Sequence, residues 1–201
     1  MRKFALLATV FAFSLLVNLA SAQQADAALG FGTIVAPGAS PCNAATLLCP
    51  EKGGLYPNLS FDVVFRHRIG FSYEVAWKGS QGAYGGTGGQ PFRPIINDFN
   101  AIFQPRLSKK VGLDLVAGVG WQSTRFYGYQ NTVSCNYFYA CYQSSNHFVF
   151  DAGGGIRYYL WGHMFVRPEV RFYNVHNNIA DFTNGNIVRV GASIGYTIGP
   201  D

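Results

Sequence analysis

The sequence has few charged side chains and, beyond its first residues, no long apolar run. Lys, Arg, Asp and Glu make up 12% of the 201 residues, about half the usual share of a soluble domain. Apart from Arg2 and Lys3, 13 of the 15 basic residues remain against 10 acidic ones, too small an excess to indicate a nucleic-acid partner. No apolar run reaches the roughly 18 residues of a transmembrane helix. These absences disfavour an ordinary soluble enzyme, a nucleic-acid-binding protein and a helical membrane protein.

The start of the chain is the one strongly apolar segment. A basic opening, "MRK", is followed by "FALLATVFAFSLLVNLA" and by the small residues Ala20, Ser21 and Ala22. This order is typical of a secretory signal peptide, which we expect to span residues 1–22 and to be cleaved after Ala22. A retained membrane anchor is the alternative. The mature protein would then be one domain, residues 23–201, exported from the cytoplasm.

Cysteine is also scarce, and its four copies form two local pairs. Export permits disulfides, and among the three possible connectivities the simplest joins Cys42 to Cys49 and Cys135 to Cys141. Zinc binding is the rival interpretation, but the spacings are wider than those of usual zinc pairs and no histidine lies between the paired cysteines. We therefore expect disulfides, with no metal and no cofactor.

Glycine and aromatic residues are plentiful, and apolar residues recur at every second position. In "VGLDLVAGVGW", Val111 to Trp121, one face is apolar and the other carries mainly glycines and Asp114. Side chains of a strand point alternately to opposite faces, so such alternation predicts β-strands. Eight segments are predicted as strands, the first being the weakest: 28–36, 55–66, 70–78, 95–106, 111–121, 147–160, 164–176 and 186–199.

The connections between these segments alternate between short and long. The short ones are 67–69, 107–110 and 161–163, and the longer ones are 37–54, 79–94, 122–146 and 177–185. This alternation predicts an all-β, eight-stranded, antiparallel, up-and-down transmembrane β-barrel. The short turns and both ends of the mature chain would lie in the periplasm, and the longer loops, with both cysteine pairs, outside the cell.

The charged residues of the predicted strands share the face opposite the apolar one. Facing lipid at mid-membrane, an Arg or Lys would cost about 2–4 kcal/mol, so in a bilayer the apolar face must lie outward. Six acids and seven bases, nearly balanced, would then meet inside. The predicted ion-pair network of the lumen consists of Asp62, Arg66, Glu74, Asp98, Asp114, Asp151, Arg157, Arg167, Glu169, Arg171 and Arg189. Lys78 and Arg106 are the other two bases predicted on this face. A soluble lipocalin-like binding barrel, with the faces reversed, is the alternative.

Aromatic residues gather near the ends of the predicted strands, as is typical of membrane interfaces. Pro168 falls in mid-strand, where it removes a ladder donor, and predicts a local bulge. The predicted aromatic girdles contain Phe65, Trp77, Trp121, Tyr158 and Trp161.

Together these features resemble the small bacterial outer-membrane β-barrel family, which includes the OmpA-type transmembrane domain and the opacity-like surface proteins. The most specific likeness is in the last strand, where Arg189, Gly191, Ile194 and Tyr196 match the pattern that the barrel-assembly machinery reads in this family. Members usually end on an aromatic residue, whereas this chain continues as "TIGPD". The resemblance implies an outer-membrane location, with membrane lipid and that machinery as partners.

An eight-stranded barrel leaves an interior just wide enough for side chains to fill. We therefore expect a non-enzymatic protein with an envelope-structural or adhesin-like role carried by its extracellular loops. Loop 122–146, rich in tyrosine, is the predicted contact for a surface ligand. A narrow or gated channel is one alternative. A lipid-modifying outer-membrane enzyme is another, but no nucleophile and base can be assembled from the sequence, although His147 lies near Ser144 and Ser145.

Overall fold

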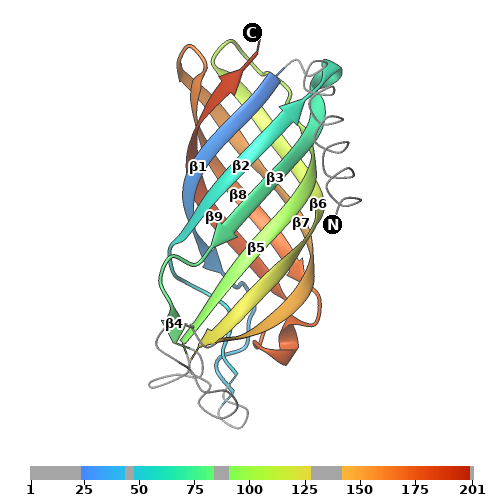
Figure 1. Cartoon of the computed structure of the whole chain (residues 1–201). Coiled ribbons are helices and arrows are strands. Elements are labelled where there is room, and N and C mark those ends of the chain that lie inside the picture. Colours follow the sequence, from blue (N-terminus) through green and yellow to red (C-terminus); the bar gives the residue numbers. More distant parts are fainter. Residues whose placement is uncertain (1–23, 44–47, 84–90, 128–141, 200–201) are drawn as a thin grey trace, which may run out of the picture.

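The computed structural model describes residues 24–43, 48–83, 91–127 and 142–199, which form one closed antiparallel β-barrel (Figure 1). The eight-stranded barrel predicted from the sequence is confirmed. A two-residue strand, β4 (Gly82–Ala83), adds to the loop end of the sheet. The eight long strands are β1 (Gln24–Val35), β2 (Tyr56–Val64), β3 (Ile69–Trp77), β5 (Pro91–Phe103), β6 (Val111–Tyr127), β7 (Tyr142–Trp161), β8 (Met164–Val175) and β9 (Asn186–Ile198).

Closure comes from pairing between the first and last strands. Each long strand pairs with the next along the chain, and β9 pairs with β1 over eleven residue pairs, from Ala25 with Ile198 to Val35 with Val188. A path of paired residues that leaves β1 at Ala25 and crosses all the other strands returns to β1 at Val35, ten residues further along. A stagger of this size goes with a strand tilt of roughly 35–45°, and the strands of Figure 1 run obliquely to the barrel axis.

The short turns and the longer loops lie at opposite ends of the barrel. The start of β1, the end of β9 and the short turns share the upper end in Figure 1, and β4 and the described parts of the β1–β2 and β8–β9 loops share the lower end. The turn between β2 and β3 contains the 3-10 segment η1 (Arg66–Arg68). A second 3-10 segment, η2 (Asn178–Ala180), lies in the longer β8–β9 loop at the lower end. No helix among the described residues is long and apolar enough to cross a membrane.

The side chains alternate as the sequence predicts, with the apolar set outward. On β6 Leu115, Val119 and Trp121 are 42–45% exposed, whereas Asp114, the residue before Leu115, is 3% exposed. The same holds around the barrel, where Phe61 and Phe71 are more than half exposed. A soluble protein would not present so continuous an apolar surface to water. We conclude that this surface faces lipid.

Several strand bounds and one local feature differ from the sequence prediction. β1 and β5 each begin four residues before the predicted start. β6 and β7 extend six and five residues beyond the predicted ends, because their ladder continues where apolar alternation has ceased. The prediction of a bulge at Pro168 is wrong, because β8 keeps one register with β7 from Glu169 to Phe165. The register instead shifts between Tyr159 and Trp161, beside the turn. Pro168 still pairs in sequence order with Ala192 of β9.

Candidate functional site

The lumen holds an ionic core whose part nearer the short turns is organised by two arginines. Arg157 Nη1 lies 2.6 Å from Asp26 Oδ2, and Arg157 Nη2 lies 2.9 Å from Asp114 Oδ2. Arg167 Nη1 is 3.3 Å from Asp62 Oδ2 and 3.1 Å from Asp114 Oδ2. All five side chains are nearly inaccessible to solvent. The two guanidinium groups therefore join carboxylates from β1, β2 and β6 across the interior.

The part nearer the loops is organised by Arg171 and Arg189. Arg189 pairs with Glu74 and, at 3.0 Å, with Glu169 Oε1. Arg171 Nη1 lies 3.3 Å from Asp151 Oδ2, and its Nη2 lies 3.6 Å from Glu74 Oε2. Arg167 Nε, 3.0 Å from Glu169 Oε2, links this group to the first. The result is one continuous network along the lumen.

Acids outnumber bases in this core, which corrects the nearly balanced count expected from the sequence. Lys78 lies instead at the loop end over the Phe92 ring, and Arg106 lies at the short-turn end over the Tyr159 ring. The side chain of Arg66 is outside the described part of the chain. The remaining bases are the four arginines named above, and the buried lumen carboxylates belong to Asp26, Asp62, Glu74, Asp98, Asp114, Asp151 and Glu169.

Asp98 is the most isolated of these carboxylates. Within the described residues no Arg or Lys lies within ion-pair distance of Asp98, and its directly paired neighbour on β3 is Glu74, which has the same charge. Asn100 donates a hydrogen bond to Asp98 Oδ1, but Oδ2 accepts none from a described residue. Like charges directly opposite each other destabilise a sheet. The core therefore carries a local excess of negative charge beside β5.

An apolar layer closes the lumen on the loop side of the ionic core. On five strands the next inward-facing residue beyond the ionic core, toward the loops, is apolar or aromatic. Together with Ile34 and Val175 these residues pack into one buried cluster, whose seven members are at most 2% exposed. The five are Tyr56, Ile96, Val149, Tyr173 and Ile187. We call this cluster the apolar layer; it lies between the ionic core and the loop end.

Beyond the apolar layer, Glu51 is the centre of a second buried polar group. Its Oε2 accepts hydrogen bonds from Gln122 Nε2 at 2.9 Å and from Asn178 Nδ2 at 3.1 Å. Its backbone N–H donates to Asn184 Oδ1 at 2.7 Å. Glu51 is completely buried, and this desolvation raises the pKa of its carboxyl group against the hydrogen bonds and Lys78, which lower it. Glu51 thereby joins the β1–β2 loop, β6 and the β8–β9 loop.

Backbone contacts fix the same two loops to each other. The Thr183 N–H donates to Cys49 O at 3.2 Å, and its hydroxyl donates to Ser40 O at 3.0 Å. The Cys42–Cys49 disulfide expected from the sequence is formed within the first loop. Cys135 and Cys141 lie outside the described residues. The β1–β2 and β8–β9 loops thus form a joint cover over the barrel mouth.

Replacing Glu51 with glutamine is expected to raise stability at pH 8. The pKa of this carboxyl group is higher in the folded than in the unfolded protein, so the protonated group favours folding at pH values below its ordinary pKa of 4.5. This stabilisation is lost as the pH rises through the pKa of the folded state. The amide keeps a hydrogen-bond acceptor and avoids a buried charge. Urea unfolding of the refolded barrel from pH 4 to pH 8 should show a flatter pH dependence for E51Q. Lys52→Gln, at the exposed neighbouring residue, is the control, and an E51Q midpoint below wild type at pH 8 would contradict the account.

Removing the disulfide is expected to loosen the cover without unfolding the barrel. The link spans only seven positions, so it restrains the loop by about 2–3 kcal/mol and has little bearing on the distant strand ladders. We expect Cys42→Ser/Cys49→Ser to be cleaved by trypsin after the exposed Lys52 on the order of tenfold faster than wild type. The folded, unboiled band on a detergent gel should persist. Equal cleavage rates, or loss of that band, would contradict a local role.

The only Ser–His–Asp contact among the described residues lacks the geometry of a catalytic triad. Ser145 Oγ lies 2.9 Å and Asp181 Oδ2 lies 2.8 Å from the same ring atom, His147 Nε2. A relay needs the acid on one ring nitrogen and the nucleophile on the other. The described residues also contain no group of three or more His, Cys, Asp or Glu side chains that could hold a metal ion.

The other sequence-predicted residues lie on the barrel wall. Arg189 points inward to the ionic core, whereas Ile194 and Tyr196 face outward and are about half exposed. Gly191 packs against the backbone of Phe31 in β1, where a Cβ would lie 2.5 Å from the Phe31 carbonyl oxygen. The five aromatic residues assigned to girdles are half-buried or exposed. Phe65, Trp77, Tyr158 and Trp161 lie near strand ends, whereas Trp121 lies six residues before the end of β6.

Sequence reasoning missed Asp26, Glu51 and the apolar layer. Asp26 carries a signal, an acid flanked by alanines two residues after Gln24, but it preceded the expected start of the first strand. The apolar layer could not be predicted from the sequence, because its apolar residues occupy inward positions at which the strand pattern predicts polar ones. Glu51 has no sequence signal, since its burial depends on two loops that meet only in the folded barrel.

Comparison with solved structures identifies the architecture. The chain superposes on Neisserial surface protein A with a TM-score of 0.59 at 11% identity, covering 86% of this chain and 95% of that one. It matches the Ail attachment invasion locus protein of Yersinia pestis with a TM-score of 0.54 at 12% identity, over 87% and 98% of the two chains. The chain has the fold of the small outer-membrane β-barrels. A major outer membrane protein of Thermus thermophilus shares this barrel at a TM-score of 0.53 and 10% identity, over 87% and 99%. No protein-family model and no curated protein sequence matches the chain.

Proposed function

We propose that this outer-membrane-type barrel is a non-enzymatic surface protein that recognises a ligand through its tallest hairpin. The observation that carries the proposal is the extension of β6 and β7 beyond the apolar wall. Six residue pairs, from Gln122 with His147 to Tyr127 with Tyr142, continue the ladder past Trp121 and Phe148. We call residues 122–127 and 142–147 the tall hairpin.

The outward face of the tall hairpin changes character at this boundary. Below it, Val119, Trp121 and Phe150 face lipid; above it the outward residues are polar or amphipathic. This change is expected where a strand pair leaves the membrane, and it supports an extracellular position for the hairpin. The outward residues above the boundary are Ser123, Arg125, Tyr127, Tyr142, Ser144 and Asn146.

An arginine and two tyrosines dominate this face. The Arg125 guanidinium lies 4.8 Å from the centre of the Tyr142 ring, and the Tyr127 and Tyr142 rings lie 5.9 Å apart. Such side chains are held in place before a ligand arrives, which lowers the entropy lost on binding. Arginine beside hydroxyl and amide groups suits an anionic, hydroxyl-rich ligand such as a sulfated sugar. Ail, which shares the fold, was solved in complex with the heparin analogue sucrose octasulfate, which supports this choice of probe.

The interior favours recognition over transport or catalysis. The apolar layer closes the ionic core on the loop side, which argues against a channel. The contacts of His147 argue against an acyl-transfer site. We further propose that the protein resides in the outer membrane after removal of residues 1–22, and that the assembly machinery reads Arg189, Gly191, Ile194 and Tyr196 in β9.

Binding of sucrose octasulfate to the refolded chain in lipid nanodiscs tests the recognition proposal. We expect Arg125→Ala to weaken binding about tenfold, the loss of one charge-assisted hydrogen bond. Lys109→Ala, which removes an exposed charge at the opposite end, should leave the affinity unchanged. Absence of binding by wild type at 0.15 M salt, or an equal loss in both variants, would refute a sulfated ligand on the tall hairpin.

A further inference from the structure

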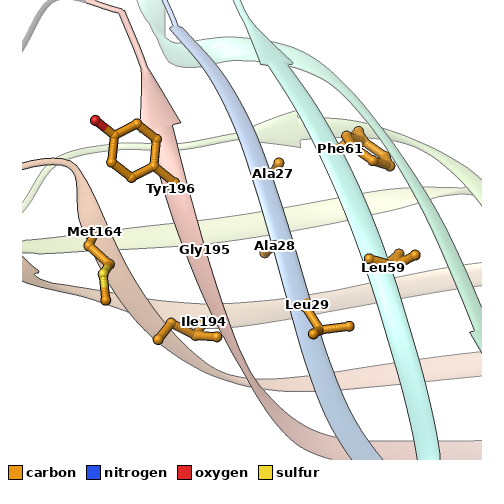
Figure 2. A pocket seen from close by; sticks show the side chains of 9 residues that line it. All are labelled: Ala27, Ala28, Leu29, Leu59, Phe61, Met164, Ile194, Gly195 and Tyr196. Atoms are coloured by element: carbon orange, nitrogen blue, oxygen red, sulfur yellow. The ribbon is translucent and has the colours of Figure 1, made fainter.

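The outer wall of the barrel offers a ligand almost no polar atom. A hollow on this wall, where β1 and β9 meet, is lined almost entirely by apolar atoms. Figure 2 shows its small residues Ala28 and Gly195 beside the larger Leu29, Ile194 and Tyr196. In the ionic core, by contrast, several buried oxygen atoms have no hydrogen-bond partner among the described residues. A charged ligand would therefore be held inside the barrel.

Three of these oxygen atoms belong to neighbouring positions on β5 and β7. They are Asp98 Oδ2, Asn100 Oδ1 and Asp151 Oδ1, which we call the oxygen cluster. The three residues are 0%, 2% and 5% exposed. A polar atom buried without a partner costs free energy, so each such atom in a folded protein requires an explanation.

The strand between β5 and β7 leaves room for a bound ion. Gly118 of β6 pairs with Asn100 on one side and with Asp151 on the other, and Gly120 pairs with Asp98. No side chain of β6 therefore separates the members of the oxygen cluster. The Cα atoms of residues two strands apart lie roughly 10 Å from each other, a distance that two short side chains and one ion between them can span.

The amide of Asn100 has only one orientation that suits its surroundings. Its Nδ2 donates to Asp98 Oδ1, and the reverse orientation would bring two acceptors together. Asn100 Oδ1 therefore lies over Gly118, where a Cβ would be only 2.5 Å away from it. A neutral, buried and unpartnered oxygen thus points into the gap that Asp151 borders. This observation does not depend on the charge of the two acids.

A second amide oxygen in the lumen shows what distinguishes the oxygen cluster. Asn58 Oδ1 is also buried without a partner among the described residues, and it lies over Gly30, 2.5 Å from the position of a Cβ. The residues that pair with Gly30 are Asn58 and Ser193, so no carboxylate borders this position. Only at Gly118 does such an amide oxygen lie beside acids.

The charge of the ionic core also favours a cation at the oxygen cluster. Seven buried carboxylates share four arginines there. Both oxygens of Glu74 accept hydrogen bonds, and Asp151 Oδ2 lies 3.3 Å from Arg171 Nη1. Asp98 forms no ion pair with a described base, so the negative charge is least compensated at this cluster. An uncompensated buried charge is strongly unfavourable.

We propose that Asp98, Asn100 and Asp151 bind one Ca²⁺ ion inside the barrel. Ca²⁺ is bound by carboxylate, amide and water oxygens in flexible geometry, whereas Mg²⁺ demands a near-ideal octahedron. Two carboxylates and one amide oxygen from two strands suit the less demanding ion, and water would complete its coordination. Because only two of the three residues are acids, the cluster differs from the groups of three or more His, Cys, Asp or Glu that the described residues lack.

Metal analysis of the refolded protein tests the proposal directly. Ile96 and Val149 of the apolar layer are the next inward residues on the loop side, so the ion would exchange slowly and is supplied during refolding. The chain is refolded with Ca²⁺ in a non-ionic detergent and desalted, and its metal content is measured by mass spectrometry. Wild type should retain one Ca²⁺ per chain, also when refolded with equal Mg²⁺. Asp98→Asn should retain less than about a tenth as much.

Urea unfolding with either EDTA or Ca²⁺ gives a second measurement. A ligand that binds only the folded state stabilises it, and at about 100 times its Kd it raises the folding equilibrium constant about 100-fold. Excess Ca²⁺ should therefore raise the unfolding midpoint of wild type. Asp98→Asn should be more stable than wild type in EDTA and should not respond to Ca²⁺. Misfolding cannot explain a lost response in a variant that is the more stable one without the ion.

A matched variant separates the oxygen cluster from the rest of the ionic core. Asp62→Asn removes a lumen carboxylate whose two oxygens both accept hydrogen bonds, from Ser72 and from Arg167. It should lower stability in both buffers and keep the Ca²⁺ response. Wild type without Ca²⁺, which would mean that the cluster holds only water or a proton, would overturn the proposal. Equal retention by Asp98→Asn, or loss of the response in folded Asp62→Asn, would do the same. Neither measurement depends on binding at the tall hairpin.

Discussion

Replacing Arg157 with methionine is expected to lower the free energy of unfolding by about 3–5 kcal/mol, the cost of leaving a buried charge network without one partner. Arg157 lies within 3.6 Å of carboxylates from three other strands: Asp26, Asp62 and Asp114. Methionine has similar length but no charge, so the carboxylates of a core already rich in acids would face one another. The loss reflects uncompensated charge rather than lost packing.

Urea unfolding of the refolded protein, followed by tryptophan fluorescence, measures this loss. Arg125→Met, on the half-exposed tall hairpin, is the matched control and should cost under about 1 kcal/mol. Asp98→Asn should raise the free energy of unfolding instead. It removes a carboxylate that lies opposite Glu74 and that forms no ion pair with a described base. If Arg157→Met were neutral, or Asp98→Asn destabilised as strongly, the ionic core would not have the charge excess described here.

An arginine at Ala117 is expected to cost about 2–4 kcal/mol, because it would place a charge on the lipid-facing side near the middle of the wall. Ala117 points outward on β6, and its paired neighbours on both sides, Ala101 and Ala152, are also small. A long side chain therefore fits there without a clash. The expected cost therefore comes from the charge of the arginine and not from its size.

Heat modifiability on a detergent gel and urea unfolding in vesicles test this second expectation. Ala117→Met controls for size and should remain near wild type. Trp121→Arg, at the loop-side edge of the apolar wall, should cost at most about 1 kcal/mol for its charge, because that penalty falls toward the interface. A harmless Ala117→Arg would mean that the apolar face does not meet lipid, and a soluble barrel would have to be reconsidered.

The barrel could be predicted from the sequence because lipid outside and ions inside impose a strict period of two. "VGLDLVAGVGW" is read correctly in both strand and face, since each outward residue had to be apolar and Asp114 had to point inward. The prediction failed where that demand ceases. Beyond Trp121 the ladder continues with Ser123 and Arg125. Polar residues such as these are compatible with water in a strand as well as in a loop, so the sequence does not distinguish the two.

The candidate sites depended more on the tertiary structure. The sequence placed Arg157 and Asp114 on the inner face, but which acids each arginine meets depends on the stagger of the strands. The Glu51 group required two loops to be brought together. Small residues of β1 and β9, such as Ala28 and its partner Gly195, lie far apart along the chain and become neighbours only on closure.

That closure also bears on how the protein unfolds. The junction between β1 and β9 brings Asp26 and Arg189 into the same interior, and Arg157 of β7 reaches Asp26 of β1 across it. Parting this junction would admit water to the whole network at once, with no half-open barrel in which some charges stay paired and dry. Loss of a single strand contact and loss of the entire structure should therefore coincide, so that the barrel behaves as one cooperative unit rather than as a row of hairpins.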